Sequence, residues 1–420
     1  MNHRVRLRGK VLLPVLAVAP LIFSGEAWGE EGKALAWPQW RGPSRDAQVK
    51  ESPPWPKDLA TLTREWRVEL GPGYSGPILW GERVFVTETE AKTDEGVRAL
   101  DRATGRELWR ARWSGAMSVP FFAKKNGDWI RATPACDGES LFVAGMRDVL
   151  VCLNIETGAE RWRVDFSDKL GTPLPSFGFV CSPLVMGEHV YVQAGGGFVK
   201  LNKRSGDILW RTLVDGGGMN SAFSSPIAAT LHGIPQLIVQ TRETLAGVAP
   251  DTGEVLWSQK VPAFRGMNIL TPTLFQDGIL TSSYQNKTFF YRIEKEDSGL
   301  KVREAWTVPV QGYMSSPVII GRHAYLHLGN GRACCLDLQE GKETWRTNPF
   351  GEYWSMVANG DRILALDEQG ELLLIEADPR EFRLLDRKEV ANAEAWAHLA
   401  VSGDRVFVRD LRGVSAFVWK

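Results

Sequence analysis

The chain has none of three sequence motifs that commonly mark enzymes. It contains no G-x-S-x-G nucleophile turn, no P-loop and no H-E-x-x-H metal motif. Each of these would place a nucleophile, a phosphate cradle or zinc ligands at a fixed spacing. His323 and His327 are four residues apart, but the strand-like pattern around them offers no nearby third ligand, so we expect no metal site. The sequence therefore predicts no catalytic residues, although a repeat fold can still build a site from residues far apart in the chain.

Neither sign of charge is in excess. Lys and Arg together number 50, Asp and Glu together number 50, and the formal net charge at pH 7 is +0. A nucleic acid or an anionic membrane would be attracted by an excess of basic residues, so the composition points to neither. We expect a protein partner or an extended peptide instead, with the chain acting as a monomer or as part of a complex.

Cysteine is scarce and odd in number. The 5 cysteines are Cys136, Cys152, Cys181, Cys334 and Cys335. An odd count in an exported protein leaves at least one thiol unpaired within the chain, so this is not a disulfide scaffold. The adjacent Cys334 and Cys335 could form a strained disulfide or serve as small buried apolar residues. Their place in a repeated strand pattern favours the second interpretation.

No hydrophobic run beyond the N-terminal region is long enough to span a membrane. The N-terminal region itself has the three parts of a secretory signal peptide: a basic stretch, the apolar run Val11–Phe23 and the small-x-small sequence Ala27-Trp28-Gly29. We therefore predict a cleaved signal peptide over residues 1–29 and a periplasmic or secreted protein, with an uncleaved anchor as the alternative. No cysteine lies near the cleavage site, so the sequence does not predict a lipid anchor.

What the sequence does contain is a repeat. The copy Ser315–Thr347 reads as four short strands joined by tight turns, and its last strand carries Trp345. Endings of the type D/N-x-x-[TSE]-G followed by Trp recur along the chain. The Gly in these turns supplies a positive φ, and the flat Trp can fill the wedge between neighbouring repeats. The tryptophans of the series are Trp66, Trp109, Trp162, Trp210, Trp257, Trp306 and Trp345.

The first strand of the repeat can be counted separately, and it occurs eight times. Copies start near Ser75, Ala132, Cys181, Ser224, Leu270, Ser315, Trp354 and His398. Repeats of this length with four strands each predict an all-β, eight-bladed β-propeller of four-stranded antiparallel blades. The last copy has only about three strands, so we expect the N-terminal strand Leu62–Leu70 to complete it and protect its edge. The predicted organisation is a signal peptide (1–29), a linker or strap lying across the propeller wall (30–61) and a single propeller (62–420).

An aromatic residue recurs just before the first strand of each copy, except in the fifth, which has Asn268. The series consists of Tyr74, Trp129, Phe179, Phe223, Tyr313, Trp354 and Trp396. In a propeller these residues would surround one mouth of the central channel, where they could form a platform for a ligand or an extended peptide. They could equally pack the tops of the blades. Long links join the last strand of one copy to the first strand of the next. Arg131, Arg242 and Arg265 lie in or near these links and could hold carboxylates.

The recurring SSP…G-x-x-V-Y-V…L-D-x-x-T-G-x-x-x-W pattern resembles the pyrroloquinoline-quinone-like propeller repeat family over about Leu62–Lys420. Stretches such as GGGMNSAFSSPIAATLHG and PAFRGMNILTPTLF resemble its exported BamB-like branch. The resemblance implies a non-enzymatic scaffold that helps to assemble outer-membrane β-barrel proteins, with the channel-mouth face as interaction surface and no cofactor. The alternative from the same superfamily is a quinoprotein alcohol or sugar dehydrogenase, which holds pyrroloquinoline quinone and Ca²⁺. This chain lacks the W-x-x-x-x-Y-D motif and the early cysteine pair of those dehydrogenases.

Overall fold

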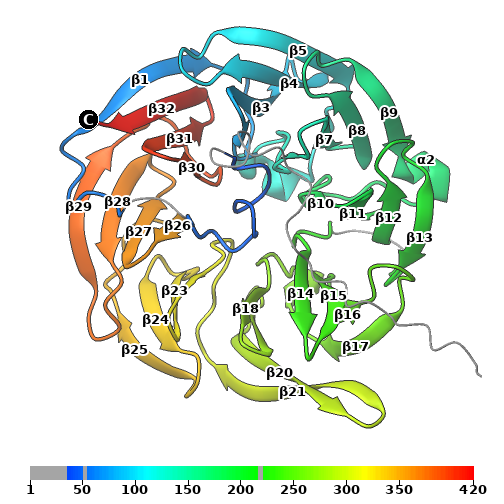
Figure 1. Cartoon of the computed structure of the whole chain (residues 1–420), viewed down its shortest axis with the longest axis vertical. Coiled ribbons are helices and arrows are strands. Elements are labelled where there is room, and N and C mark those ends of the chain that lie inside the picture. The colour runs from blue at the N-terminus through cyan, green and yellow to red at the C-terminus, as the bar shows by residue number, and fades with distance from the viewer. Residues whose placement is uncertain (1–35, 51–53, 216–220) are drawn as a thin grey trace, which may run out of the picture.

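The structure is a computed structural model that describes residues 36–50, 54–215 and 221–420. Its strands form eight separate four-stranded antiparallel sheets, arranged as the blades of a ring around a central channel (Figure 1). This confirms the predicted eight-bladed propeller. The predicted signal peptide, residues 1–29, lies outside the described residues. Within the described part, no helix is long and apolar enough to cross a membrane.

Each blade runs from an inner strand at the channel to an outer strand at the rim. Blades 1 to 4 consist of β2 (Ile78–Trp80), β3 (Arg83–Glu90), β4 (Asp94–Asp101) and β5 (Glu107–Ser114); β6 (Ala135–Cys136), β7 (Ser140–Gly145), β8 (Val149–Asn154) and β9 (Glu160–Asp165); β10 (Leu184–Met186), β11 (His189–Ala194), β12 (Gly197–Asn202) and β13 (Ile208–Thr212); and β14 (Ile227–Leu231), β15 (Ile234–Gln240), β16 (Thr244–Val248) and β17 (Val255–Lys260). Blades 5 to 8 consist of β18 (Thr273–Phe275), β19 (Gly278–Ser282), β20 (Thr288–Glu296) and β21 (Gly299–Val308); β22 (Val318–Ile320), β23 (His323–His327), β24 (Ala333–Asp337) and β25 (Lys342–Arg346); β26 (Ser355–Asn359), β27 (Arg362–Leu366), β28 (Glu371–Glu376) and β29 (Arg383–Glu389); and β30 (Ala400–Ser402), β31 (Arg405–Asp410) and β32 (Gly413–Trp419) with β1 (Leu62–Glu69).

The N-terminal strand closes the ring, as predicted. β1 pairs antiparallel with β32, from Leu62 opposite Trp419 to Glu69 opposite Gly413. Because β32 would otherwise be an exposed sheet edge, this pairing removes a site of aggregation. The Arg67 guanidinium adds a two-pronged ion pair to the buried Asp410 carboxylate, at 2.7 and 3.1 Å.

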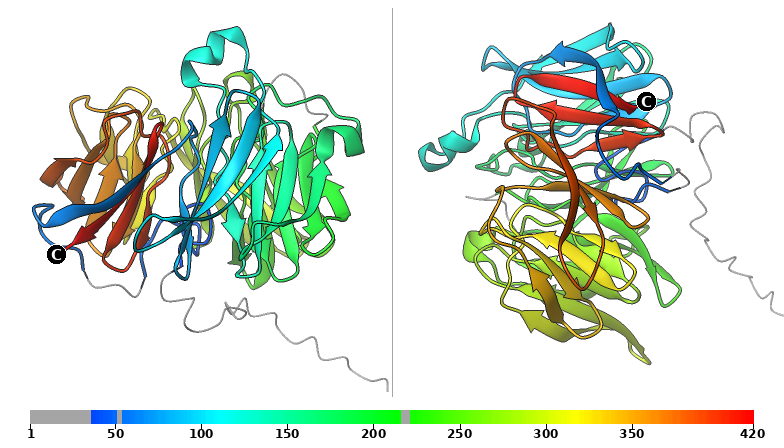
Figure 2. Two further views of the ribbon diagram at one scale, coloured as in Figure 1. Left: turned by 90° about the horizontal axis from the view of Figure 1, so that it is seen from above. Right: turned by 90° about the vertical axis from the view of Figure 1, so that its left-hand side faces the viewer.

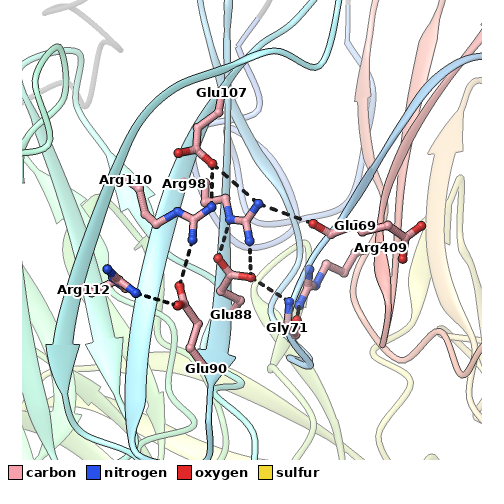
Figure 3. A network of polar contacts seen from close by, with 9 residues as sticks. All are labelled: Glu69, Gly71, Glu88, Glu90, Arg98, Glu107, Arg110, Arg112 and Arg409. Atoms are coloured by element: carbon pink, nitrogen blue, oxygen red, sulfur yellow. Dashed lines mark hydrogen bonds and ion pairs between the residues drawn. The ribbon is translucent and has the colours of Figure 1, made fainter.

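A second polar network joins blade 8 to blade 1 at this closure (Figure 3). The buried Glu88 carboxylate accepts hydrogen bonds from the Arg98 guanidinium and, at 2.6 Å, from the Gly71 amide. The Arg409 guanidinium from blade 8 donates to the Gly71 carbonyl at 2.9 Å. Gly71 begins a G-x-G-x-x-G string, but the strand β2 follows it rather than a helix. The glycines therefore permit close packing at the seam and form no phosphate cradle.

The strand pattern follows from the position of each strand in a blade. Middle strands are covered on both faces by neighbouring blades, so all six residues of β7 are buried. Outer strands face solvent on one side, and β25 alternates strictly between exposed and half-buried residues. The hydrophobic core is therefore a set of clusters between adjacent blades rather than one central mass.

The repeated tryptophans lock one blade to the next. The Trp109 indole on β5 donates to the Ile155 carbonyl of blade 2 at 3.1 Å, and its ring lies on Gly158 of the same turn. Gly158 has φ 72°, which favours glycine. The same inter-blade indole bond is made by Trp66, Trp162, Trp210, Trp306 and Trp345. Trp257 departs from the pattern, because its indole donates to Gln236 within its own blade.

Hydroxyl groups before the inner strands form a second set of links, nearer the channel. The Thr133 hydroxyl accepts from the Gly76 amide at 2.9 Å, and the Ser182 hydroxyl accepts from the Thr133 amide at 3.1 Å. The Ser225 hydroxyl continues the series by accepting from the Ser182 amide at 3.0 Å. The small polar residue that opens each copy of the repeat therefore ties neighbouring blades together.

The expectation that the strap 30–61 lies across the propeller wall was wrong for the segment 36–50. Residues 54–61 do meet the outer strand β29, where the Asp386 carboxylate accepts from the Leu59 amide at 2.7 Å. The segment 36–50 enters the channel and contacts the inner edges of opposite blades (dark blue in Figure 1). Its Trp37 pairs with Leu79 of blade 1 and its Val49 amide bonds to Ala358 of blade 7. The buried Arg45 guanidinium donates to the Ser182 and Pro183 carbonyls of blade 3 at 2.9 and 2.7 Å. The segment was misplaced because its partners are main-chain carbonyls, which leave no mark in a sequence.

All five cysteines are buried and free. Cys334 and Cys335 lie on β24 inside blade 6, where small apolar residues are needed. Burial raises the pKa of the Cys335 thiol to about 11, so this thiol stays protonated at neutral pH.

Candidate binding site at the channel mouth

The links between an outer strand and the next inner strand emerge on one face of the ring. Figure 2 shows the longest described link, between β5 and β6, standing above that face, with the segment 36–50 toward the opposite side. We name the face that carries the links the channel-mouth face. Loops on a rigid scaffold are the usual place for binding.

Six aromatic side chains form a continuous row on the channel-mouth face. Successive ring centroids lie 6.1, 4.7, 5.6, 4.6 and 5.0 Å apart. These distances are in the range of favourable aromatic pairs. The row, which we name the aromatic arc, consists in spatial order of Phe264, Tyr284, Tyr313, Tyr353, Trp396 and Tyr74. Phe264 is exposed and the other five are half-buried, so the arc presents ring surface to solvent across blades 5, 6, 7, 8 and 1.

Three of the predicted residues belong to the arc: Tyr74, Tyr313 and Trp396. The half-buried Trp129 extends its end, because its indole hydrogen-bonds to the Tyr74 hydroxyl. The exposed Arg265 lies over the Phe264 ring at 5.2 Å from the centroid, at the other end. Phe223 lies apart from the arc, in a smaller group with Phe177 and Phe122.

Phe179 and Trp354 do not reach the surface, which corrects their assignment to a platform. Phe179 is 2% exposed and packs edge-on against Phe166. Trp354 is 4% exposed and stacks on His327, with ring centroids 4.5 Å apart. Both side chains turn into the blades, so they hold the scaffold and offer a ligand no surface.

The sequence prediction did not include three residues of the arc: Phe264, Tyr284 and Tyr353. Tyr353 is the neighbour of Trp354, and successive residues of an extended chain point to opposite sides. With Trp354 turned inward, Tyr353 turns outward; the strand alternation could have indicated this. Tyr284 lies in the turn between β19 and β20. This turn lies on the same face but is not a link between blades, so the repeat pattern did not indicate it.

The arc is uncharged, with acidic groups beside it. Burial raises the pKa of Tyr74 and that of Tyr353 to about 12, so both phenols stay neutral at physiological pH. The Glu368 carboxylate accepts from the Tyr353 amide at 2.7 Å. Burial, and then the charge of Glu352, raises the pKa of Glu368 to about 7. The arc therefore offers flat faces and hydroxyl donors next to titrating carboxylates.

The arginines near the links are already engaged. The Arg131 guanidinium donates to the Gly127 carbonyl at 2.8 Å and lies over the Tyr74 ring at 5.9 Å from the centroid. Arg242 forms an ion pair with Asp215. A pocket lined by Phe179, Gln193 and Arg242 has a cavity volume of only about 30 Å³, room for roughly two or three water molecules. The arc, rather than this pocket, is the surface large enough to hold a ligand.

Two observations concern a quinone held with Ca²⁺. In the described ranges, no group of three or more His, Cys, Asp or Glu side chains could hold a metal ion. Cys334 and Cys335 are buried inside blade 6, away from the channel. Because Ca²⁺ also binds Asn, Gln and main-chain oxygens, the absence of a Ca²⁺ site stays a prediction.

Solved structures share the fold. The BamB structure from Moraxella catarrhalis superposes with a TM-score of 0.62 at 16% identity, covering 86% of this chain and 98% of that chain. The quinohemoprotein alcohol dehydrogenase from Comamonas testosteroni superposes with a TM-score of 0.55 at 12% identity, covering 92% of this chain and 81% of that one. At such low identities these likenesses concern the fold alone.

Proteins related in sequence indicate the family of this chain. An outer membrane protein assembly factor BamB from Yersinia pestis is 24% identical over 58% of this chain, and the match spans 63% of that protein's length. The protein of the same name from Shewanella oneidensis is 22% identical over 76% of this chain and 79% of its own length. The family model described as "Outer membrane protein assembly factor BamB" matches residues 93–347, which is more than half of the chain. This chain therefore belongs to the BamB family of PQQ-like repeat propellers.

Proposed function

We propose that this protein is an exported, non-enzymatic binding propeller that takes part in outer-membrane protein assembly. In this proposal the signal peptide 1–29 is removed, and the channel-mouth face binds a protein partner or an extended polypeptide in the periplasm. The observation that carries the proposal is the aromatic arc, a row of ring contacts that crosses five blades. The proposed process, outer-membrane protein assembly, is taken from the names of the family and of the two relatives.

An extended polypeptide suits the arc better than a compact ligand does. Strands of outer-membrane barrels alternate apolar and polar side chains, so every second side chain can contact a ring while the backbone meets the phenol hydroxyls. Aromatic faces contribute large contact area at low conformational cost. The proposed contacts are Tyr74, Tyr313, Tyr353 and Trp396 in the arc, with Trp129 and Arg265 at its ends. Phe223 would act as a separate contact.

The second candidate function is a quinone-binding oxidoreductase. Its support is the fold shared with a quinohemoprotein alcohol dehydrogenase. The buried cysteine pair does not support that cofactor, nor does the absence, in the described ranges, of a group of three or more His, Cys, Asp or Glu side chains that could hold a metal ion. The absence of any cofactor stays a prediction, and the binding function is favoured.

The test is the affinity for a fluorescent peptide that has the alternating apolar pattern of an outer-membrane β-strand, measured by anisotropy. We expect wild-type protein to bind it and Tyr353→Ala/Trp396→Ala to bind it at least about tenfold more weakly, since stacking on each ring is worth roughly 0.5–1.5 kcal/mol beyond area burial. Leu209→Ala, which changes an exposed residue on the outer strand β13, is the matched control. Equal affinity of the double variant and wild type would reject the arc as the binding site.

A further inference from the structure

The link between β5 and β6 carries the most exposed large apolar side chain described in the protein. Its 3-10 helix η1 (Phe121–Asn126) presents Phe121 at 86% exposure and Phe122 at 53%. Figure 2 shows the link projecting beyond the neighbouring loops of the channel-mouth face. Two adjacent exposed phenylalanines at a projecting tip are not explained by the aromatic arc, which they do not join.

The tip has a well-packed base, so the exposure of its phenylalanines does not result from loose packing. Val119 and Ala123 are 4% and 6% exposed and pack with Met146 of blade 2. The Val119 amide donates to the Asp128 carboxylate at 2.8 Å. The inward positions of the link are thus filled by small apolar residues. Phe121 points away from them, and Phe122 lies edge-on to Phe177 while it stays 53% exposed.

Basic residues surround the tip. Lys124, in η1 itself, is exposed. Two further exposed basic residues, Lys92 and Arg147, come from turns that contact the link. Lys92 precedes Thr93, whose carbonyl accepts a hydrogen bond from the Gly115 amide of the link. Arg147 follows Met146, which packs in the core of the link. Of the nearby carboxylates, Asp128 accepts from the Val119 amide, and Glu90 is paired with Arg110 and Arg112. The buried Glu95 accepts from the Met146 amide, and Asp94 is half-buried.

We propose that this tip docks onto the surface of an anionic lipid bilayer. Phe121 and Phe122 would enter the interface between headgroups and acyl chains, and Lys124 would contact a lipid phosphate. Apolar insertion and attraction to anionic lipid add to each other at a membrane surface. The balanced charge of the whole chain does not oppose this, because the attraction acts within a Debye length of the tip. Docking in this way would turn the channel-mouth face toward the membrane.

The test is co-sedimentation of residues 30–420, which contain every described strand, with phosphatidylcholine vesicles that contain about 30% phosphatidylglycerol or none. We expect partitioning into the anionic vesicles. Phe121→Ala should lower the partition coefficient about tenfold, and Lys124→Gln should lower it about fivefold. Phe121→Trp should retain partitioning, because Trp favours the membrane interface. Leu209→Ala should leave it unchanged.

A site-specific label checks the orientation of the tip. Because all native thiols are buried, a cysteine introduced as Phe121→Cys can be labelled selectively with an environment-sensitive nitrobenzoxadiazole dye. Anionic vesicles should shift its emission to the blue, and a label at Leu209→Cys on the outer wall should not respond. The proposal is overturned if wild-type protein does not partition into anionic vesicles, if Phe121→Ala partitions as strongly as wild type, or if both labels shift equally.

Discussion

At the scale of single residues, the ring depends on tryptophans that lie on glycines of the next blade. At Gly158, a Cβ would lie 2.4 Å from the Trp109 ring, too close for any side chain. The positive φ of that turn adds backbone strain for any residue but glycine. The repeat motif therefore encodes an inter-blade contact as well as a turn.

Gly158→Ala should lower the free energy of unfolding by about 2–4 kcal/mol, combining left-handed strain with overpacking. The matched control is Gly187→Ala, which has φ 55° and no atom within 4 Å of the added Cβ. The control should lose only about 1–2 kcal/mol. Urea unfolding of both variants and wild type measures the difference. An equal loss in the two variants would mean that the contact between Trp109 and Gly158 contributes nothing.

Glu95 makes stability depend on pH. Burial raises its pKa from 4.5 to about 7, although the Met146 amide and the Trp113 indole donate to it. The folded protein holds a proton that the unfolded chain releases, so stability falls as pH rises from 4.5 to about 7 and stays lower above that range.

We expect wild type to lose about 2–3 kcal/mol more than Glu95→Gln when the pH rises from 5 to 8. Urea unfolding of both proteins at the two pH values checks this. Glu368 has a raised pKa in both proteins, so its contribution cancels in the comparison. Parallel behaviour of the two proteins would show that Glu95 is ionised in the folded state below pH 7.

At the scale of elements, β1 decides whether the ring is closed. Its buried ion pair, Arg67 with Asp410, and its more exposed pair, Glu65 with Arg405, provide an internal comparison. The Asp410 side chain is 1% exposed, whereas those of Glu65 and Arg405 are 25% and 26% exposed. Loss of the buried partner would leave an uncompensated carboxylate inside the protein.

Arg67→Ala should therefore cost about 3–5 kcal/mol, and Arg405→Ala about 1 kcal/mol or less. Thermal unfolding with light scattering measures both stability and aggregation. Aggregation should begin at lower temperature in Arg67→Ala, because release of β1 exposes the edge of β32. Equal melting temperatures for the two variants would contradict this role of β1 in closure.

The elements that sequence could predict are those whose interactions repeat. The blades and the closing strand follow from turn glycines, strand alternation and the Trp series, because each copy repeats the same turn and strand pattern. The segment 36–50 has no period, and Arg45 bonds to main-chain carbonyls that are 137 and 138 residues away. For the site, the links were predicted correctly as the origin of most aromatic contacts. The sequence alone did not show whether Tyr353 or Trp354 is the exposed aromatic residue, because this depends on which of the two side chains turns into the blade.

At the scale of the whole molecule, the propeller is closed, its channel is crossed by segment 36–50, and its exposed aromatic surface lies on one face. A rigid ring can hold six aromatic side chains from five blades in register without ordering any of them on binding. This preorganisation reduces the entropic cost of capturing an extended chain.

The most direct test of the binding function is a thermal melt of the protein with three additions: the alternating β-strand peptide, pyrroloquinoline quinone with Ca²⁺, and buffer. A ligand at 100 times its Kd adds about 2.7 kcal/mol of stability, which is readily seen as a higher Tm. We predict that the peptide raises the Tm of wild type, that it leaves the Tm of Tyr353→Ala/Trp396→Ala near its value in buffer, and that the quinone has no effect. A rise with quinone and none with peptide would contradict the account and favour an oxidoreductase.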